Sequence, residues 1–371
     1  MASRRIAIIG LGEAGYEMHL PALAQMKNVT VVGACDVDEQ RRARATGKFG
    51  VPVFADLDSM LTAVRPEVLI VATPPETHAA LCLRAIEQGF NVVCEKPFVS
   101  SLDEADTVID AAGAAGRRIA LNHEFREMPI FRSVIEGAGP ASGEDLFFAQ
   151  VWQSTDIPQG VESGWRGQMQ RRTLHEAGVH LVDLVLGLFG EQPVAVWASM
   201  TNGGAMEGGS DALTVVSLEF TGGRLAQLVQ NRLCKGEPHY LELRADTRTA
   251  SYRASFGGRA RIITGLYRST KPSVRIEYGT SGLAWREIGN DRTIIARNPG
   301  DPRVAATRRV LEKSLDAFDT GGALPSSAAD GRDALEVINA CYTAADTGQR
   351  TLVARDSTLR PGLSRSGSTS S

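Results

Sequence analysis

Residues 5–15, with the sequence RIAIIGLGEAG, decide the fold of this chain. They join a short apolar run, typical of a buried strand, to a turn with the spacing G-x-G-x-x-G and then to a helical pattern. In such a turn Gly10 permits the tight bend, Gly12 lets the backbone approach a pyrophosphate, and Gly15 lets the helix pack on the strand. The stretch therefore predicts a phosphate-binding turn at the N-terminus of a helix.

An acidic residue follows the turn at the distance that a dinucleotide site requires. Asp36 ends the next apolar run, 29–36, and a carboxylate about twenty residues after the turn hydrogen-bonds the adenosine ribose of NAD. The same charge repels the 2′-phosphate of NADP, so we expect NAD as the cofactor. Arg41 and Arg42 could pair with that phosphate if Asp36 swung aside. The alternative is that Asp36 only caps a helix over 37–48.

Short Val- and Ile-rich runs alternate with helical patterns through the first third of the chain. These runs lie at 5–10, 29–36, 67–74, 90–97 and 117–123. Strand, crossover helix and strand in repetition are typical of a doubly wound parallel sheet. We expect a Rossmann domain over residues 1–123.

The pattern changes after residue 143 to long alternating runs with few helices between them. The runs lie at 146–154, 194–200, 212–220, 224–232 and 240–252, and helical patterns lie at 174–189, 304–319 and 331–346. Strands in series indicate an antiparallel sheet. We expect a second domain over 124–355 and a disordered Ser- and Gly-rich tail over 356–371.

Composition narrows the class of protein. The chain has 371 residues, 40 basic and 43 acidic residues and a formal net charge of -3, a balance that argues against nucleic acid as a partner. Its five cysteines lack CxxC spacing, which indicates a reducing compartment, and no apolar run is long enough for a membrane span. We expect a cytoplasmic protein with no membrane partner.

Two polar features point to chemistry. The run 91–94 breaks into Glu95-Lys96-Pro97, so that Lys96 lies at a strand end of the sheet that binds the dinucleotide. On the helix predicted over 174–189, Glu176, His180 and Asp183 fall on one polar stripe.

The same helix also rules out one kind of site. His175 and His180 are five residues apart and point about 140° apart on a helix, which excludes a shared metal ion. We therefore expect no metal site.

Together with the turn, several short motifs resemble the Gfo/Idh/MocA oxidoreductases, the group of glucose-fructose oxidoreductase and inositol dehydrogenase. The motifs are GLGEAG, His19-Leu20-Pro21-Ala22, Ala72-Thr73-Pro74 with His78, Glu95-Lys96-Pro97, Arg126 three residues before Pro129, and Gly178-Val179-His180 with Asp183. The resemblance extends to about residue 355. It implies a Rossmann domain joined to an open, mostly antiparallel sheet with helices on one face, in a homodimer or homotetramer.

The resemblance also implies a reaction and a set of site residues. Family members oxidise or reduce a hydroxyl or carbonyl on a sugar, cyclitol or related polyhydroxylated ring. The positions that match the family's cofactor-facing residues are Gly12, Glu13, Ala14, Asp36, Thr73, Pro74, His78, Glu95 and Lys96, and Gly10 and Gly15 of the turn complete the expected cofactor site. Alcohol oxidation needs a base and a fixed cation; His180 and Lys96 supply them, and Glu176 is expected to orient His180.

The chain departs from the family pattern beside the expected base. Glu176 stands where the family has aspartate, and Arg171-Arg172-Thr173 replaces a glycine cluster. Arg171 and Arg172 either recognise a carboxylate or phosphate on the substrate or form a solvated charge pair.

Candidate substrate contacts come from two further segments. Asn122, His123, Glu124 and Arg126 follow the fifth predicted strand, on the rim where α/β sheets bind ligands. Trp165 and Arg166 resemble a loop that lines the sugar pocket in this family, although the indole of Trp165 could only shield the sheet.

Two other functions share this fold. One is a hydrolase that keeps NAD bound and cleaves a glycosidic bond through transient oxidation and elimination. The other is a non-catalytic, cofactor-binding regulator, which would be expected to lack the lysine or the histidine.

Overall fold

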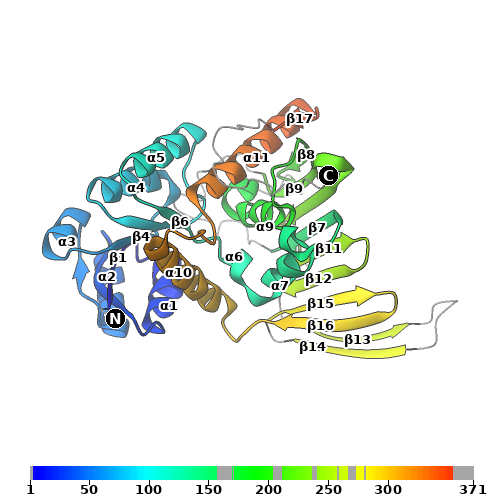
Figure 1. Cartoon of the computed structure of the whole chain (residues 1–371), viewed down its shortest axis with the longest axis horizontal. Helices are drawn as coiled ribbons and strands as arrows, with labels where there is room; N and C mark the ends of the chain where they lie inside the picture. The colour runs from blue at the N-terminus through cyan, green and yellow to red at the C-terminus, as the bar shows by residue number, and fades with distance from the viewer. Residues whose placement is uncertain are drawn as a thin grey trace, which may run out of the picture.

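The computed structural model describes residues 3–156, 169, 171–203, 211–235, 240–256, 259–265, 273–279 and 281–353. Trp165, Arg166 and the predicted tail 356–371 lie outside these ranges. The described chain forms two large sheets that lie side by side and one small hairpin, with the C-terminal helices α10 (Pro302–Thr320) and α11 (Ala328–Thr347) beside and between the large sheets (Figure 1). No helix within the described part is long and apolar enough to cross a membrane.

The first sheet is the predicted parallel Rossmann sheet. Its strand order is β3-β2-β1-β4-β5-β6 and all its pairings are parallel. The strands are β1 (Arg4–Ile9), β2 (Val29–Cys35), β3 (Val53–Phe54), β4 (Val68–Val71), β5 (Asn91–Cys94) and β6 (Ile119–Leu121). The order reverses between β1 and β4, and ligands of such sheets bind at the carboxyl ends of the strands beside this reversal.

Helices connect these strands and cover the sheet. They are η1 (Ala14–His19), α1 (Leu20–Ala24), α2 (Glu39–Phe49), α3 (Leu57–Ala63), η2 (Pro75–Thr77), α4 (His78–Glu87) and α5 (Leu102–Ala114). The strand interiors β1, β4 and β5 are almost wholly buried, as expected for a sheet covered on both faces.

The second sheet is open and mostly antiparallel, as predicted. Its nine strands are β7 (Leu146–Ser154), β8 (Ala195–Thr201), β9 (Leu213–Glu219), β10 (Leu225–Asn231), β11 (Tyr240–Thr247), β12 (Ser251–Phe256), β15 (Leu283–Ile288), β16 (Asp291–Arg297) and β17 (Thr351–Leu352). The exception is β7, which pairs with β10 in parallel. Because β8, β9 and β10 form a meander, the last of them returns alongside β7 in the same direction. A separate hairpin joins β13 (Arg259–Gly265) and β14 (Ser273–Gly279).

Helices pack on one face of this sheet and contribute to its core. They are α6 (Glu124–Glu127), α7 (Pro129–Ala138), η4 (Thr173–Ala177), α9 (Val179–Phe189) and α11, with short turns at η3 (Pro140–Ser142) and η5 (Thr221–Gly223). The alternating burial of β9 and β10 is the pattern of strands with one covered face.

The two C-terminal helices also complete the core of the first sheet. Val304, Leu311 and Leu315 of α10 belong to the apolar cluster that holds Ile6 and Ile70. In the same way, α11 contributes residues to the clusters of both sheets. The predicted boundary at residue 123 therefore stays a prediction, since chain from beyond it packs into the first sheet.

The helix predicted over 174–189 is built from two pieces. The first piece, η4, is a π-helix in which the N–H of Gly178 donates to the carbonyl oxygen of Thr173 at 2.8 Å, and α9 follows from Val179. A π-turn contains one residue more than an α-turn, which rotates Glu176 relative to His180. The single polar stripe that we predicted for this helix is thus interrupted at Gly178. The predicted end at Gly190 is confirmed, with a left-handed φ of 67°.

Candidate functional site

One cleft of about 1160 Å³ contains most of the predicted site residues. This volume exceeds the roughly 300–1,000 Å³ of typical small-ligand pockets, which suits an extended ligand such as a dinucleotide. The cleft runs from the carboxyl ends of the first sheet to α6, η4, α9 and the end of β12. Its predicted lining residues are Gly10, Gly12, Glu13, Ala14, Asp36, Thr73, Pro74, Glu95, Lys96, Glu124, Glu176 and His180.

The Gly-rich turn has the geometry of a phosphate cradle. Gly10 has a φ of 95°, and a Cβ on Gly15 would lie only 1.9 Å from the carbonyl oxygen of Gly10, so larger residues would not fit. At Gly12, by contrast, a Cβ would meet only Nη1 of Arg41 at 3.9 Å. The space beside Gly12 and the N-terminus of η1 therefore fit a pyrophosphate group.

Asp36 is held in place by the backbone. Its carboxylate accepts hydrogen bonds from the N–H of Leu11 at 2.7 Å and of Asp38 at 2.9 Å, and Nη1 of Arg41 lies 3.6 Å from Oδ2. The alternative assignment of Asp36 as a helix cap is wrong, because Asp38 caps α2 by accepting from the N–H groups of Gln40 and Arg41. The Asp36 carboxylate lines the cleft where an adenosine ribose would lie in a bound dinucleotide.

Glu95 links the end of β5, where Lys96 lies, to His19 of η1. One carboxylate oxygen lies 2.8 Å from Nε2 of His19 and accepts from Nδ2 of Asn122 at 2.7 Å. Burial raises the pKa of Glu95, but the hydrogen bond and charge of His19, the amide of Asn122 and the charge of Lys96 outweigh it and lower the pKa to about 2. Glu95 is thus a fixed anion beneath Lys96.

Lys96 reaches across the cleft to η4. Its Nζ donates to the carbonyl oxygen of Glu176 at 3.1 Å and lies 3.9 Å from Oε1 of the same residue. The ammonium group therefore stands between the two halves of the cleft, in a position to donate to a substrate oxygen.

His180 faces Glu124 and Phe125. Its ring stacks on Phe125 with 4.2 Å between the centroids and an interplanar angle of 16°, and Nδ1 lies 3.8 Å from Oε2 of Glu124. Burial, then the charges of Lys96 and His123, hold the pKa of His180 well below its usual range, so the imidazole is neutral at pH 7. A neutral imidazole can accept a proton.

Several predicted site residues support the cleft without lining it. His78 is buried behind the turn, where its ring nitrogens contact the carbonyl oxygens of Thr73, Pro97 and Phe98. His123 and Arg126 both pair with Asp183, while the Asn122 side chain bonds to Glu95. These contacts fit roles in holding other residues, while Nε2 of His123 and Oδ1 of Asn122 are buried without a hydrogen-bond partner among the described residues.

The two arginines beside η4 also lie outside the cleft. Arg171 forms an exposed ion pair with Asp346 at 2.5 Å, and its guanidinium lies 5.1 Å from the ring centroid of Tyr342. Arg172 is 1% exposed, and its side chain is among the largest that are fully buried. The solvated-pair alternative fits Arg171, whereas Arg172 is buried and is not among the described residues that line the cleft.

Three residues of the site region carried no local signal in the sequence. Arg303, at the start of α10, lines the cleft and places Nη1 3.5 Å from Oε1 of Glu13. Phe256 lines the cleft from β12. Asp211 accepts hydrogen bonds from three backbone N–H groups at the start of η4 and from the hydroxyl of Tyr342. All three act across long sequence separations, and only the folded chain brings them together.

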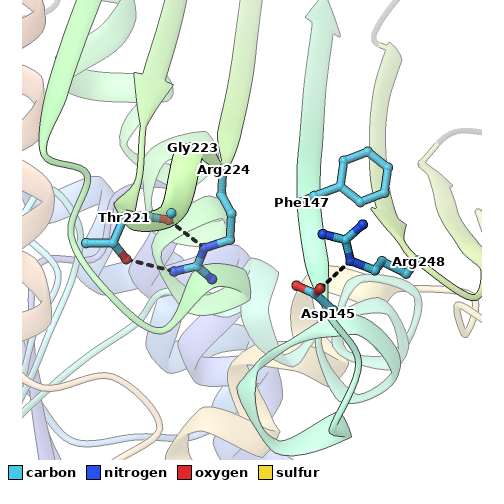
Figure 2. Close-up of a pocket in the computed structure, with 7 residues that line it drawn as sticks. Asp145, Phe147, Thr221, Gly223, Arg224 and Arg248 are labelled. Atoms are coloured by element: carbon cyan, nitrogen blue, oxygen red, sulfur yellow. Dashed lines mark hydrogen bonds and ion pairs between the residues drawn. The ribbon is translucent and has the colours of Figure 1, made fainter.

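A second, shallower hollow of about 560 Å³ lies at one end of the open sheet. Figure 2 shows Arg224 bonded to Thr221 on one side and Arg248 bonded to Asp145 on the other, with the ring of Phe147 beside Arg248. Arg224 also pairs with Glu191 at 2.6 Å. Exposed pairs of this kind contribute about 0–1 kcal/mol, and we assign no ligand to this hollow.

Family models match both halves of the chain. Residues 4–123 match the model described as an oxidoreductase family with an NAD-binding Rossmann fold, and residues 145–251 match the Gfo/Idh/MocA C-terminal domain. The chain belongs to the Gfo/Idh/MocA family. The resemblance stated from the motifs is thereby confirmed.

Curated relatives of this Gfo/Idh/MocA chain include sugar and inositol dehydrogenases. A glucose-6-phosphate 3-dehydrogenase from Bacillus subtilis is 29% identical over 193 residues, which cover 50% of this chain and 54% of the relative. An inositol 2-dehydrogenase from Rubrobacter xylanophilus is 28% identical over 235 residues, which cover 62% of this chain and 65% of the relative. The matches thus span about half to two thirds of these relatives.

Solved structures show the same fold over nearly the whole Gfo/Idh/MocA chain. An oxidoreductase from Agrobacterium radiobacter, solved with NAD+, L-tartaric acid and magnesium, superposes with a TM-score of 0.77 and covers 95% of this chain and 99% of its own. Its sequence identity is 17%, so this likeness supports the fold alone. The predicted pairing of a Rossmann sheet with an open, mostly antiparallel sheet is confirmed.

Proposed function

We propose that this protein is an NAD-dependent oxidoreductase that transfers a hydride between the cofactor and a secondary alcohol or ketone of a sugar, cyclitol or related polyhydroxylated ring. One observation carries the proposal. A single cleft is lined by the phosphate-binding turn at one end and by Lys96 and His180 at the other. The names of the curated relatives support the substrate class.

The roles of the site residues follow from the chemistry of alcohol oxidation. When bound, the nicotinamide supplies the hydride acceptor. His180, neutral at pH 7, accepts the hydroxyl proton, and Lys96 donates a hydrogen bond to the same oxygen as negative charge develops on it. The bond from Nζ of Lys96 to the carbonyl oxygen of Glu176 supports this role, because it limits where the ammonium can go. In the reverse direction the acid and base roles exchange.

NAD is the proposed cofactor in preference to NADP. The two backbone N–H groups that hold the Asp36 carboxylate oppose the movement that a 2′-phosphate would require. Arg42, the second candidate phosphate ligand, already donates from Nη1 to the carbonyl oxygens of Asp36 and Val37 at 2.8 and 2.9 Å.

The proposal is tested by a substrate screen with each cofactor. The panel contains myo-inositol, glucose 6-phosphate, free aldoses and sugar acids, with simple hydroxy acids such as tartrate as the contrasting class. Nicotinamide absorbance reports oxidation, and NADH with the matching ketones reports reduction. Turnover of ring polyols with NAD is expected. Turnover of simple hydroxy acids alone would contradict the proposed substrate class.

A homodimer or homotetramer is the proposed assembly. The face of the open sheet away from the helices exposes Trp152 of β7, Trp197 of β8, Val215 of β9 and Leu225 of β10, each between 37% and 50% exposed. Apolar side chains grouped on one face are typical of a protein interface. Light scattering coupled to size-exclusion chromatography measures the mass directly, and Trp197→Glu should reduce it to that of a monomer.

A further inference from the structure

A second carboxyl group, Glu124, lies against the proposed base. Glu124 is 3% exposed, and its Oε2 lies 3.8 Å from Nδ1 of His180. Both atoms are buried and neither has a hydrogen-bond partner among the described residues. Two unpaired buried polar atoms that face each other favour a contact, and a movement of about 1 Å would close this gap to hydrogen-bond length.

The neighbour of Glu124 fixes the imidazole ring. Phe125 stacks on the ring of His180, so consecutive residues of α6 hold one face of the imidazole and approach its Nδ1 edge. Glu176, which we expected to orient His180, instead has its described contacts with Lys96. The buried Nδ1 makes no hydrogen bond with Glu176.

We propose that Glu124 is the proton partner of His180, and that its ionisation selects which tautomer of the imidazole faces the substrate. The proposal rests on the proposed function, because it assigns the direction of proton transfer in that reaction. Glu124 acts through His180 and is therefore a positioning residue.

The two protonation states prepare the site for opposite directions. A protonated Glu124 donates to Nδ1, which leaves the hydrogen on Nε2 and prepares His180 to protonate a carbonyl oxygen during reduction. An ionised Glu124 accepts from Nδ1–H, which leaves Nε2 free to remove a hydroxyl proton during oxidation. Neutral imidazole is present in both states.

The pair and the solvent together account for the proton, and the cofactor accounts for the hydride. In oxidation, Nε2 of His180 takes the hydroxyl proton, Nδ1 releases its own proton to the Glu124 carboxylate, and the hydride leaves the carbon with its electron pair for the cofactor. Glu124 then loses the proton to solvent. Reduction reverses each transfer, so that no further oxidant or acid is needed.

The surrounding charges place this ionisation near physiological pH. Burial, together with the charge of Glu95, raises the pKa of Glu124 to about 8, against the opposing charges of Lys96 and Arg303. Two further charged pairs lie nearby: Glu176 on η4 pairs with Lys96, and His123, which acts on His180, pairs with Asp183 on α9. The pKa of His180 itself is held well below 6.5, so a change near pH 8 reports Glu124 and not protonation of the imidazole.

The test observes the tautomer of His180 directly. Protein labelled with 15N-histidine contains six imidazoles, and loss of signals in His180→Asn assigns those of His180. Long-range 1H–15N spectra of the NADH-bound protein, recorded from pH 6 to 10, distinguish Nε2–H from Nδ1–H. The expected result is a change from Nε2–H to Nδ1–H centred near pH 8. A single tautomer across the whole range would overturn the proposal.

Variants identify the carboxyl group responsible. Glu124→Gln should abolish the change of tautomer, whereas Glu124→Asp, which keeps an ionisable group, should restore a change at a shifted pH. Glu127→Gln is the matched control. Glu127 is also a buried glutamate of α6, but its carboxylate pairs with Arg309 and Lys313. A change that persists in Glu124→Gln, or that is lost in Glu176→Gln, would assign the role elsewhere and overturn the proposal. If Glu124→Gln does not fold, the wild-type titration and the Glu124→Asp comparison decide.

Kinetics give a second, independent readout. With the best ring substrate of the screen, kcat/KM for oxidation should rise about tenfold per pH unit up to pH 8, while kcat/KM for reduction should fall about tenfold per unit above it. Glu124→Gln should flatten both profiles. If no ring substrate is turned over, the proposed function fails while the tautomer titration still tests the pair. Turnover without a tautomer change would support the proposed function and contradict the role of Glu124 as the proton partner of His180.

Discussion

Replacement of Asp36 by alanine should reverse the cofactor preference, and cofactor binding can be measured without knowledge of the substrate. The Asp36 carboxylate is aimed at the expected ribose by the N–H groups of Leu11 and Asp38, at 2.7 and 2.9 Å. A hydrogen bond to a charged group contributes about 1.5–3 kcal/mol, so loss of the ribose contact should weaken NADH binding roughly 10–150-fold.

The same change should strengthen NADPH binding. Like unit charges about 4 Å apart repel by about 1 kcal/mol in water and about 4 kcal/mol at an effective dielectric constant of 20. Removal of the carboxylate should therefore improve NADPH binding at least about fivefold. It also releases Arg41, whose Nη1 lies 3.6 Å from Oδ2, to pair with the phosphate. The ratio of the two dissociation constants should change at least about 50-fold.

Fluorescence titration with NADH and NADPH measures both constants. Asp38→Ala is the matched control, because it removes an equal charge two residues away from Asp36. The Asp38 side chain caps α2 and is 45% exposed. It should lower stability by about 1 kcal/mol and leave the ratio unchanged. The double variant Asp36→Ala/Arg41→Ala should keep the gain that comes from the lost repulsion and lose the further gain that Arg41 adds. An unchanged ratio in Asp36→Ala, or an equal change in Asp38→Ala, would refute the assignment of Asp36.

Three further predictions concern the catalytic end of the cleft. Lys96→Met removes a charged donor and should lower kcat by about 10²–10³ while NADH still binds; near-normal turnover would contradict its role. Gly178→Ala would place a Cβ 2.7 Å from Cα of Leu174. We expect this variant to be less stable by about 1–3 kcal/mol and to have a lower kcat. Gly47→Ala is the control for a helix glycine, because a Cβ there would meet nothing within 4 Å. Asp211→Ala leaves the three N–H groups at the start of η4 unpaired. Chemical denaturation should show that the free energy of unfolding falls by about 2–4 kcal/mol. A variant as stable as the wild type would show that water replaces the carboxylate.

The parts of the site that could be predicted from the sequence share one property. In each, a strand, a turn and a helix follow directly along the chain, so the spacing itself fixes the geometry. Gly10 and Asp36 each stand at the end of a buried strand, and parallel strands bring such ends to one edge of the sheet. Lys96 was predicted by the same reasoning from the end of β5.

The interactions that could not be predicted join distant segments or depend on irregular helix geometry. Nothing in the local sequence connects Glu124 with His180, since residues of α6 and α9 meet only through packing. An ideal helix placed Glu176 over His180, but the π-helix η4 turns it to Lys96. Gly178 within the helical pattern was the one available signal, because a glycine inside a helix weakens the expectation of regular geometry.

The packing of α10 and α11 on the first sheet bears on the order in which the protein is made. Ile6 and Ile70 share an apolar cluster with Val304 and Leu311, which leave the ribosome after the whole first sheet and every strand of the second sheet except β17. At about 5–20 residues per second, the nucleotide-binding sheet waits on the order of 10–40 s for the helix that completes its core. A nascent chain that stops before α10 thus exposes this cluster, and chaperones that bind apolar surface would be expected to hold it until the last helices emerge.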